Sequence, residues 1–229
     1  PGVELRRLGP YDKTLYGRVH PRGDHVQLFR PILLVQGIFL TIVGLAMFVP
    51  MAVDAYAGRP DAQAFLISGV FTLFVGVGLW ITHTGAHGEL SLKQAFLLTA
   101  LSWLVLVVFA SIPFMLSELK LSPADSFFEA MSGLTTTGST VIVGLNDAPP
   151  GILIWRAILQ WLGGVGIIVM AIAILPMLQV GGMQLFHLES SDQSSKILPQ
   201  ARLIVSSIAA VYIGLSVLCA VAYAWAGMP

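Results

Sequence analysis

The stretch Ser122–Pro150, SPADSFFEAMSGLTTTGSTVIVGLNDAPP, lies between two long apolar segments but lacks the composition of a membrane-spanning helix. Asp125 and Glu129 place two carboxyl groups in its first half. Its middle, Thr135–Thr140, has five hydroxylated residues and one glycine, which suit neither a helix interior nor a packed core. The sequence therefore predicts a change of structure between two spanning helices.

The first half of this stretch predicts a short helix over residues 123–133. Ser122 suits the N-cap, Pro123 the first helical position, and Asp125 completes a capping-box pattern. Gly133 is placed to end the helix. Eleven residues rise about 16 Å, which is about half of a hydrocarbon core of about 30 Å. A helix that stops halfway and continues as hydroxylated, glycine-containing backbone is typical of a re-entrant pore loop.

A pore loop implies a definite chemistry. Non-helical backbone at membrane depth is tolerated only where it is buried in protein or lines a water-filled path. The C-terminus of the half-helix turns its carbonyl dipoles to the membrane centre and favours a cation there. The backbone after it can offer carbonyl oxygens in place of an ion's hydration shell. A surface loop between two spans is the alternative for residues 135–140, and the capped half-helix favours the pore loop.

Composition identifies an integral membrane protein. The chain has 229 residues, of which 56% are hydrophobic and 10% charged, and its mean hydropathy is +0.83. Soluble domains carry about 25% charged residues. The formal net charge is zero and basic residues do not alternate with aromatic ones, so no nucleic-acid partner is expected. The one cysteine, Cys219, excludes an intrachain disulfide and is expected to serve packing.

Five apolar runs are long enough to span a membrane. We expect an all-α membrane protein with an N-terminal hairpin, one helix–pore loop–helix repeat containing the re-entrant half-helix, and the first helix of a second repeat. The predicted spans are Ile32–Val53, Ala62–Thr82, Gln94–Leu116, Arg156–Val180 and Leu203–Ala226.

Small residues within these spans predict close helix contacts. In the fourth span they also allow a thin wall or a kink against which a pore loop can lie. Pro176 is expected to bend or end that span. The glycines in question are Gly69, Gly76 and Gly78 in the second span and Gly163, Gly164 and Gly166 in the fourth.

The distribution of basic residues predicts a cytoplasmic N-terminus, because lysine and arginine collect on the cytoplasmic side. With that orientation the pore loop enters from outside. The cytoplasmic side then holds nine basic residues, namely Arg6, Arg7, Lys13, Arg18, Arg22, Arg30, Lys93, Lys196 and Arg202, and the outer side holds three, Arg59, Lys120 and Arg156.

Two blocks of sequence are more specific. FFEAMSGLTTTGST (Phe127–Thr140) resembles the first pore-loop segment of TrkH-like membrane subunits in the Trk/Ktr/HKT superfamily of potassium transporters. ILQWLGGVGIIVMAIAILPML (Ile158–Leu178) resembles the helix that follows it. The resemblance implies potassium uptake across a bacterial inner membrane by a multi-pass protein, with four such loops forming one pore.

The resemblance also assigns residues and partners. It implies an ion-binding filter at Thr135, Thr136, Thr137, Gly138 and Ser139, with K⁺ held at the last four as the transported ion. It implies a homodimer in membrane lipid, gated by a cytoplasmic nucleotide-binding ring of the TrkA type. No organic cofactor and no catalytic residue are expected. In the resembled family, glycine at the position of Gly138 accompanies potassium preference and serine accompanies sodium.

Polar residues near the loop admit two roles each. Glu129 either supports the filter by accepting hydrogen bonds from loop amides or attracts cations, and its place within the pore helix favours support, together with Gly133. Asp125 is expected to be a helix-start charge rather than an ion ligand. His83 and His87 have metal-pair spacing, but no third ligand is evident and interfacial histidines are favoured.

Two other functions remain open: a short potassium or sodium channel subunit that tetramerises, and a non-conducting membrane scaffold. The start of a second unit favours a fragment of a longer transporter, and an intramembrane enzyme is not expected because no histidine lies within a predicted span. The expected parts are a basic cytoplasmic lead-in (1–30), the hairpin (31–92), the first unit (93–180, pore helix 123–133, filter 135–140), a cytoplasmic linker (181–202) and the first helix of the second unit (203–229).

Overall fold

The computed structural model describes residues 24–85, 92–174 and 194–227, and in these ranges every regular element is helical. Five helical segments are long and apolar enough to cross a membrane, which confirms the predicted all-α membrane fold. The elements are α1 (Asp24–Ala46), α2 (Phe48–Tyr56), α3 (Asp61–His83), α4 (Leu92–Leu116), α5 (Pro123–Leu134), the short 3₁₀-helix η2 (Leu145–Asp147), α6 (Pro150–Ile174) and α7 (Ser194–Trp225).

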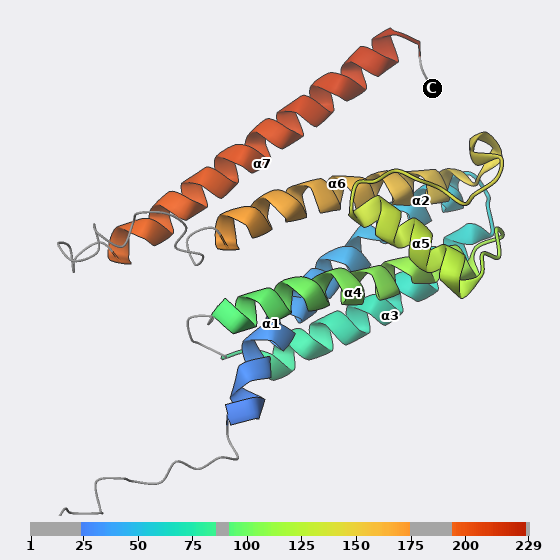
Figure 1. The fold of residues 1–229 in the computed structure, drawn as a ribbon. Coiled ribbons are helices and arrows are strands. Elements are labelled where there is room, and N and C mark those ends of the chain that lie inside the picture. Colours follow the sequence, from blue (N-terminus) through green and yellow to red (C-terminus); the bar gives the residue numbers. More distant parts are fainter. Residues whose placement is uncertain (1–23, 86–91, 175–193, 228–229) are drawn as a thin grey trace, which may run out of the picture.

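The helices form one bundle with α7 beyond it (Figure 1). Helix α1 packs along α3 and also contacts α4. The short helix α5 lies at one end of the bundle, between α4 and α6. Helix α2 continues the line of α1 to that same end, where it contacts α3 and α6. The turn between α2 and α3, the link between α4 and α5, and the start of α6 therefore lie at the same end of the molecule (Figure 1).

A single predicted span, Ile32–Val53, is divided into α1 and α2 at Met47. Pro50 has no amide hydrogen, so it cannot donate to the carbonyl of Ala46 four residues earlier. The axis nevertheless continues, because the Met47 amide donates to Val43 and the Met51 amide to Met47, both at 3.2 Å. The two pieces together form one candidate span, Phe29–Tyr56.

Glycines bring α1 and α3 into backbone contact. A Cβ atom on Gly76 would lie 2.7 Å from the Thr41 amide nitrogen, and one on Gly37 would lie 2.5 Å from the Trp80 amide nitrogen. Gly69 is close to α1 as well, with 3.3 Å to the Gly44 carbonyl oxygen. The predicted close contact is thus confirmed for Gly69 and Gly76. It is wrong for Gly78, where an added Cβ would have no atom of the described residues within 4 Å.

We expect Gly76→Ala to lower the stability of the hairpin by about 1–3 kcal/mol, because the new methyl group displaces α1 backbone rather than a flexible side chain. The measurement is the midpoint of thermal unfolding in detergent. Gly78→Ala is the matched control, since it makes the same change two residues away with no atom within 4 Å. Equal midpoints for the two variants would contradict the close packing of α1 on α3.

The core lies between α1, α3, α4, α5 and α6. Trp155 on α6 is fully buried, donates its indole N–H to the Ala110 carbonyl of α4 at 3.0 Å, and meets Phe65 of α3 edge-on with 6.3 Å between ring centroids. One side chain thereby joins three helices. The same cluster includes Leu134 and Ile142, so the segment after α5 is anchored in this core.

One predicted span starts too late, and another helix begins before its predicted span. Helix α6 begins at Pro150 rather than Arg156, because Pro150 suits the first turn, where amide hydrogens have no helical partner. Helix α7 begins at Ser194, before the predicted span Leu203–Ala226, and its membrane-span candidate is Ser206–Trp225. The predictions for the basic residues before Asp24, for His87, for Pro176 and for residues 181–193 lie outside the described residues.

Candidate functional site

Helix α5 starts as its sequence predicts. The Ser122 hydroxyl accepts the Asp125 amide at 3.2 Å and donates to the Asp125 carboxylate at 2.6 Å. The Asp125 side chain thus completes the cap through the Ser122 hydroxyl. Pro123 occupies the first helical position, and the twelve residues of α5 rise about 18 Å. Asp125 lies at the helix start, away from the loop that follows α5.

The end of α5 differs from the prediction. Gly133 does not end the helix, which continues to Leu134 with Thr135 as its C-cap. The Thr136 amide donates to the Gly133 carbonyl and the Thr137 amide to the Ser132 carbonyl, both at 2.9 Å, which is a Schellman motif. The carbonyls of Ser132 and Gly133 near the end of α5 therefore accept hydrogen bonds from loop amides.

The loop after α5 has unusual backbone angles. Thr136 takes the left-handed position of the motif with φ +59°, where glycine is the usual residue. Gly138 follows with φ +79°. The hydroxyls of Thr135 and Thr137 lie 2.9 Å apart, and that of Thr135 also donates to the Met131 carbonyl. A strained turn that the surrounding structure holds in place is typical of a functional segment.

The loop is exposed on one side and held on the other. Residues 136–141 are exposed, whereas Ser132 and Gly133 beneath them are buried. The Ser132 hydroxyl donates to the Ser139 carbonyl at 2.6 Å. In the described part of the chain, no hydrogen bond reaches the carbonyls of Thr136 and Thr137. The five predicted ion-binding residues thus lie together on one exposed turn, with only the first, Thr135, partly covered.

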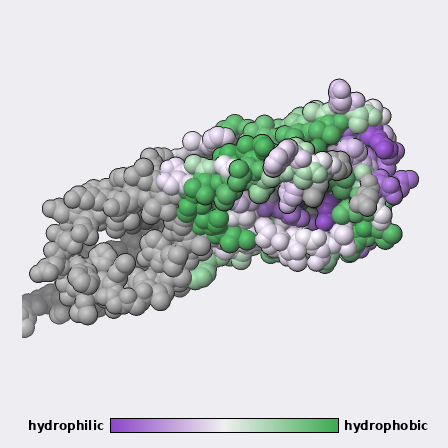
Figure 2. All heavy atoms as spheres, turned by 90° about the horizontal axis from the view of Figure 1, so that it is seen from above, coloured by the Kyte–Doolittle hydropathy of each residue, from purple (hydrophilic) through white to green (hydrophobic). Residues whose placement is uncertain are grey.

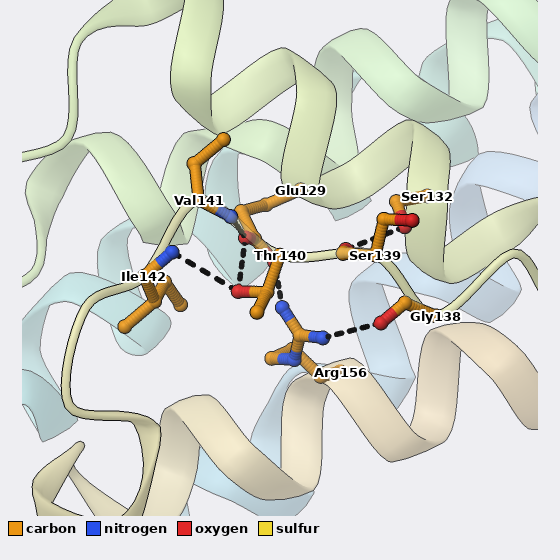
Figure 3. A network of polar contacts seen from close by, with 8 residues as sticks. All are labelled: Glu129, Ser132, Gly138, Ser139, Thr140, Val141, Ile142 and Arg156. Atoms are coloured by element: carbon orange, nitrogen blue, oxygen red, sulfur yellow. Dashed lines mark hydrogen bonds and ion pairs between the residues drawn. The ribbon is translucent and has the colours of Figure 1, made fainter.

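Glu129 connects the helix, the loop and α6 (Figure 3). Its side chain is fully buried. One carboxylate oxygen accepts the Thr140 hydroxyl at 2.5 Å and the Val141 amide at 2.6 Å. The other forms an ion pair with the guanidinium of Arg156. Thr140 in turn accepts the Ile142 amide at 3.0 Å, so the returning backbone is fixed over three consecutive residues.

Arg156 is the functional residue that sequence reasoning missed. It lies in the second turn of α6 with only 7% of its surface exposed. Its second guanidinium nitrogen lies 3.5 Å from the Gly138 carbonyl oxygen, at the long end of hydrogen-bond range. A carboxylate buried in an apolar segment is stabilised by a cationic partner, and an arginine within the apolar helix that follows was the signal for this pair.

Helix α6 fits closely against the end of α5. A Cβ on Gly163 would lie 1.8 Å from the Leu134 carbonyl oxygen, and one on Gly133 would lie 3.0 Å from Leu159 Cβ. The predicted thin wall is confirmed at Gly163. Gly164 instead faces the Tyr212 hydroxyl of α7, and Gly166 faces open space. Gly163 and Gly164 therefore allow close contact with different helices, α5 and α7.

The described surface carries both apolar and polar regions. Figure 2 shows one face that is largely hydrophobic, with hydrophilic residues gathered towards one end. Across residues 24–85, 92–174 and 194–227, no three His, Cys, Asp or Glu side chains come close enough to hold a metal ion. His83 instead contacts the Leu79 carbonyl within its own helix through its Nδ1 atom, at 2.9 Å.

Comparison with known proteins gives consistent matches. Residues 61–228 match the model of the family described as "TrkH: Cation transport protein". The chain is 42% identical over 205 residues to the Trk system potassium uptake protein TrkI of Halomonas elongata, covering 90% of this chain and 42% of that protein. It is 40% identical over 207 residues to the Trk system potassium uptake protein TrkH of Escherichia coli K12, covering 87% and 42%.

A solved structure agrees with these matches. The crystal structure of the potassium transporter TrkH from Vibrio parahaemolyticus superposes with a TM-score of 0.75 at 35% identity, covering 88% of this chain and 40% of that one. The chain thus spans about two fifths of the length of these relatives. Because the family model covers residues 61–228, the chain belongs to the TrkH family of cation transport proteins.

Proposed function

We propose that this chain supplies one of four filter loops of a potassium uptake pore, with backbone oxygens at Thr136, Thr137, Gly138 and Ser139 as ion ligands. The observation that carries the proposal is the exposed turn at 136–140 held from behind by the buried Glu129. An exposed, strained turn gains a fixed shape from that contact, as an ion site requires. The relatives' names, which state potassium uptake, support the same cargo.

The oxygens of the turn differ in their availability. The Thr136 and Thr137 carbonyls accept no hydrogen bond within the described residues, whereas Ser139 already accepts one from Ser132. A carbonyl oxygen has a second lone pair, so Ser139 retains capacity for an ion. The proposal therefore ranks Thr136 and Thr137 as the strongest ligands. Glu129 and Gly133 support the turn from behind without facing the ion.

Placement in the membrane is part of the proposal. We place the protein in a bacterial inner membrane with its N-terminus and the linker 181–202 in the cytoplasm, so that the turn after α5 is reached from outside. Helices α4, α5 and α6 form the first unit (93–180), and α7 begins the next (203–229). We further propose a homodimer gated by a cytoplasmic nucleotide-binding ring, which the family relationship supports. The uneven distribution of basic residues supports the orientation.

The experiment that tests this function is Gly138→Ser in the complete reading frame, expressed in cells that lack their own potassium uptake. We expect sodium to compete more strongly with rubidium uptake by at least about tenfold, because serine distorts a backbone of φ +79° beside the ion. Rubidium uptake is measured against rising sodium at matched amounts of protein in the membrane.

Gly144→Ser is the matched control for this change. Gly144 is also exposed and has φ +71°, and no atom would lie closer than 3.9 Å to a Cβ added there, so serine meets the same backbone strain. It lies outside the proposed filter and should leave sodium competition unchanged. Unaltered competition in Gly138→Ser, or equal changes in both variants, would argue that the turn is not the filter.

A further inference from the structure

Two buried carboxylates of the hairpin hold the backbone of the pore segment. Asp54, near the end of α2, accepts the Gly151 amide at 2.7 Å, and Asp61, at the start of α3, accepts the Glu118 amide at 2.7 Å. Asp54 is fully buried and Asp61 is 2% exposed. Seven positions separate the two aspartates, whereas their partners lie at opposite ends of the segment 118–151.

The contact of Asp54 has the features of a built site. Gly151 lies in the first turn of α6, where amide groups have no partner within the helix, so Asp54 caps α6 from another helix. A Cβ on residue 151 would lie 2.1 Å from the Asp54 carboxylate, so only glycine lets the carboxylate come this close. The fit is specific to this pair of residues.

Asp61 holds the other end of the segment. Glu118 lies in the link between α4, which ends at Leu116, and α5, which starts at Pro123. The second carboxylate oxygen of Asp61, like that of Asp54, is buried without a hydrogen-bond partner within the described chain. Burying a carboxyl group with a hydrogen bond to only one of its oxygens costs free energy, and apolar residues would fill the same space at lower cost. What the two acids provide is a fixed position for two backbone amides.

We propose that Asp54 and Asp61 form a clamp by which the N-terminal hairpin fixes both ends of the re-entrant segment and so sets the position of the 136–140 turn. In Figure 1 the turn between α2 and α3 lies at the same end of the bundle as both ends of this segment. Both aspartates are positioning residues, because neither touches the turn itself. The clamp rests on the proposed function, since its effect is read through ion selection.

The test compares Asp54→Ala, Asp61→Ala and the double variant in the complete reading frame, with rubidium uptake and sodium competition as readouts. Each single variant is expected to raise the apparent KM for rubidium and to strengthen sodium competition by about tenfold at matched amounts in the membrane, because a displacement of about 1 Å can have effects of this size. The double variant should be no worse than the worse single one, since either loss already frees the segment.

Conservative and control variants separate positioning from general damage. Asp54→Asn and Asp61→Asn keep an oxygen acceptor and should behave as the wild type. Gln36→Leu is the control: Gln36 is equally buried and donates to Ser102 on α4 at 2.9 Å, away from the segment. It should change the maximal rate at most, with KM and sodium competition unaltered.

Three results would overturn the clamp. One is normal KM and competition in both alanine variants. A second is a double variant whose effects multiply. The third is altered competition between sodium and rubidium in an asparagine variant, which would show that the charge of the aspartate matters rather than its position. The asparagine variant replaces the alanine variant in this comparison where the alanine variant fails to reach the membrane. If Gly138→Ser changes selection while the aspartate variants do not, the clamp fails and the proposed function stands; if Gly138→Ser changes nothing, the function itself fails.

Discussion

Gly163→Ala is expected to abolish uptake or reduce it by about a hundredfold. The added methyl carbon would lie 1.8 Å from the carbonyl oxygen and 2.7 Å from the carbonyl carbon of Leu134, the last helical residue of α5. These are backbone atoms in a close-packed interface, so α5 and α6 must separate by more than about 1 Å. Such a shift moves the Schellman turn that begins the exposed loop, and a misplacement of this size can cost about 10²-fold in activity.

The control for this prediction is Gly166→Ala, three residues further along α6, where no atom lies within 4 Å of the new methyl group in the described part of the chain. Both variants make the same chemical change in the same helix. Uptake and membrane amount should be near normal for Gly166→Ala. Normal uptake by Gly163→Ala would mean that the contact between α5 and α6 is looser than described.

Glu129→Gln is expected to destabilise the folded protein by about 3–5 kcal/mol, because it leaves the Arg156 guanidinium buried without a counter-charge. The amide oxygen of glutamine can still accept the Val141 amide, so the loss comes chiefly from the ion pair. The measurement is unfolding in detergent, with uptake recorded in parallel. Arg156→Met should be similarly damaging, since it leaves the carboxylate unpaired.

Two further variants sharpen this prediction. Glu129→Gln with Arg156→Met removes both charges and should be more stable than either single variant, which measures the cost of an unpaired charge. Asp125→Asn changes a carboxyl group on the same helix whose hydrogen-bond partner among the described residues is the Ser122 hydroxyl, and it should cost about 1 kcal/mol or less. Equal losses for Glu129→Gln and Asp125→Asn would show that the buried pair has no special weight.

Local signals in the sequence predicted the elements well. Runs of apolar residues located the spans, and the Ser122-Pro123-Asp125 pattern located the start of α5, because capping depends only on adjacent residues. The residues around the exposed turn were found by their composition and by resemblance. Glu129 was singled out because an ionisable group in an apolar segment requires a partner.

What the sequence did not predict depends on contacts across the fold. The sequence predicts Arg156 at the start of the fourth span because Pro150 is assigned to the loop, and only the packing of α6 on α5 brings Arg156 to Glu129. The left-handed angle falls on Thr136, since tertiary contacts override the local preference for glycine. The partners of Asp54 and Asp61 lie 97 and 57 residues away, beyond any periodic pattern.

The ion pair of Glu129 has a consequence for biogenesis. During synthesis Glu129 leaves the ribosome 27 residues before Arg156, so the carboxylate precedes its counter-charge. Translocation scales assign a cost of about 2.5–3.5 kcal/mol to a lone charge at the bilayer centre. On the proposed placement of α5 at membrane depth, this helix is expected to wait at the interface or in the translocon until α6 is made. Seating of the loop then becomes a late step of insertion, timed by the arrival of the following helix.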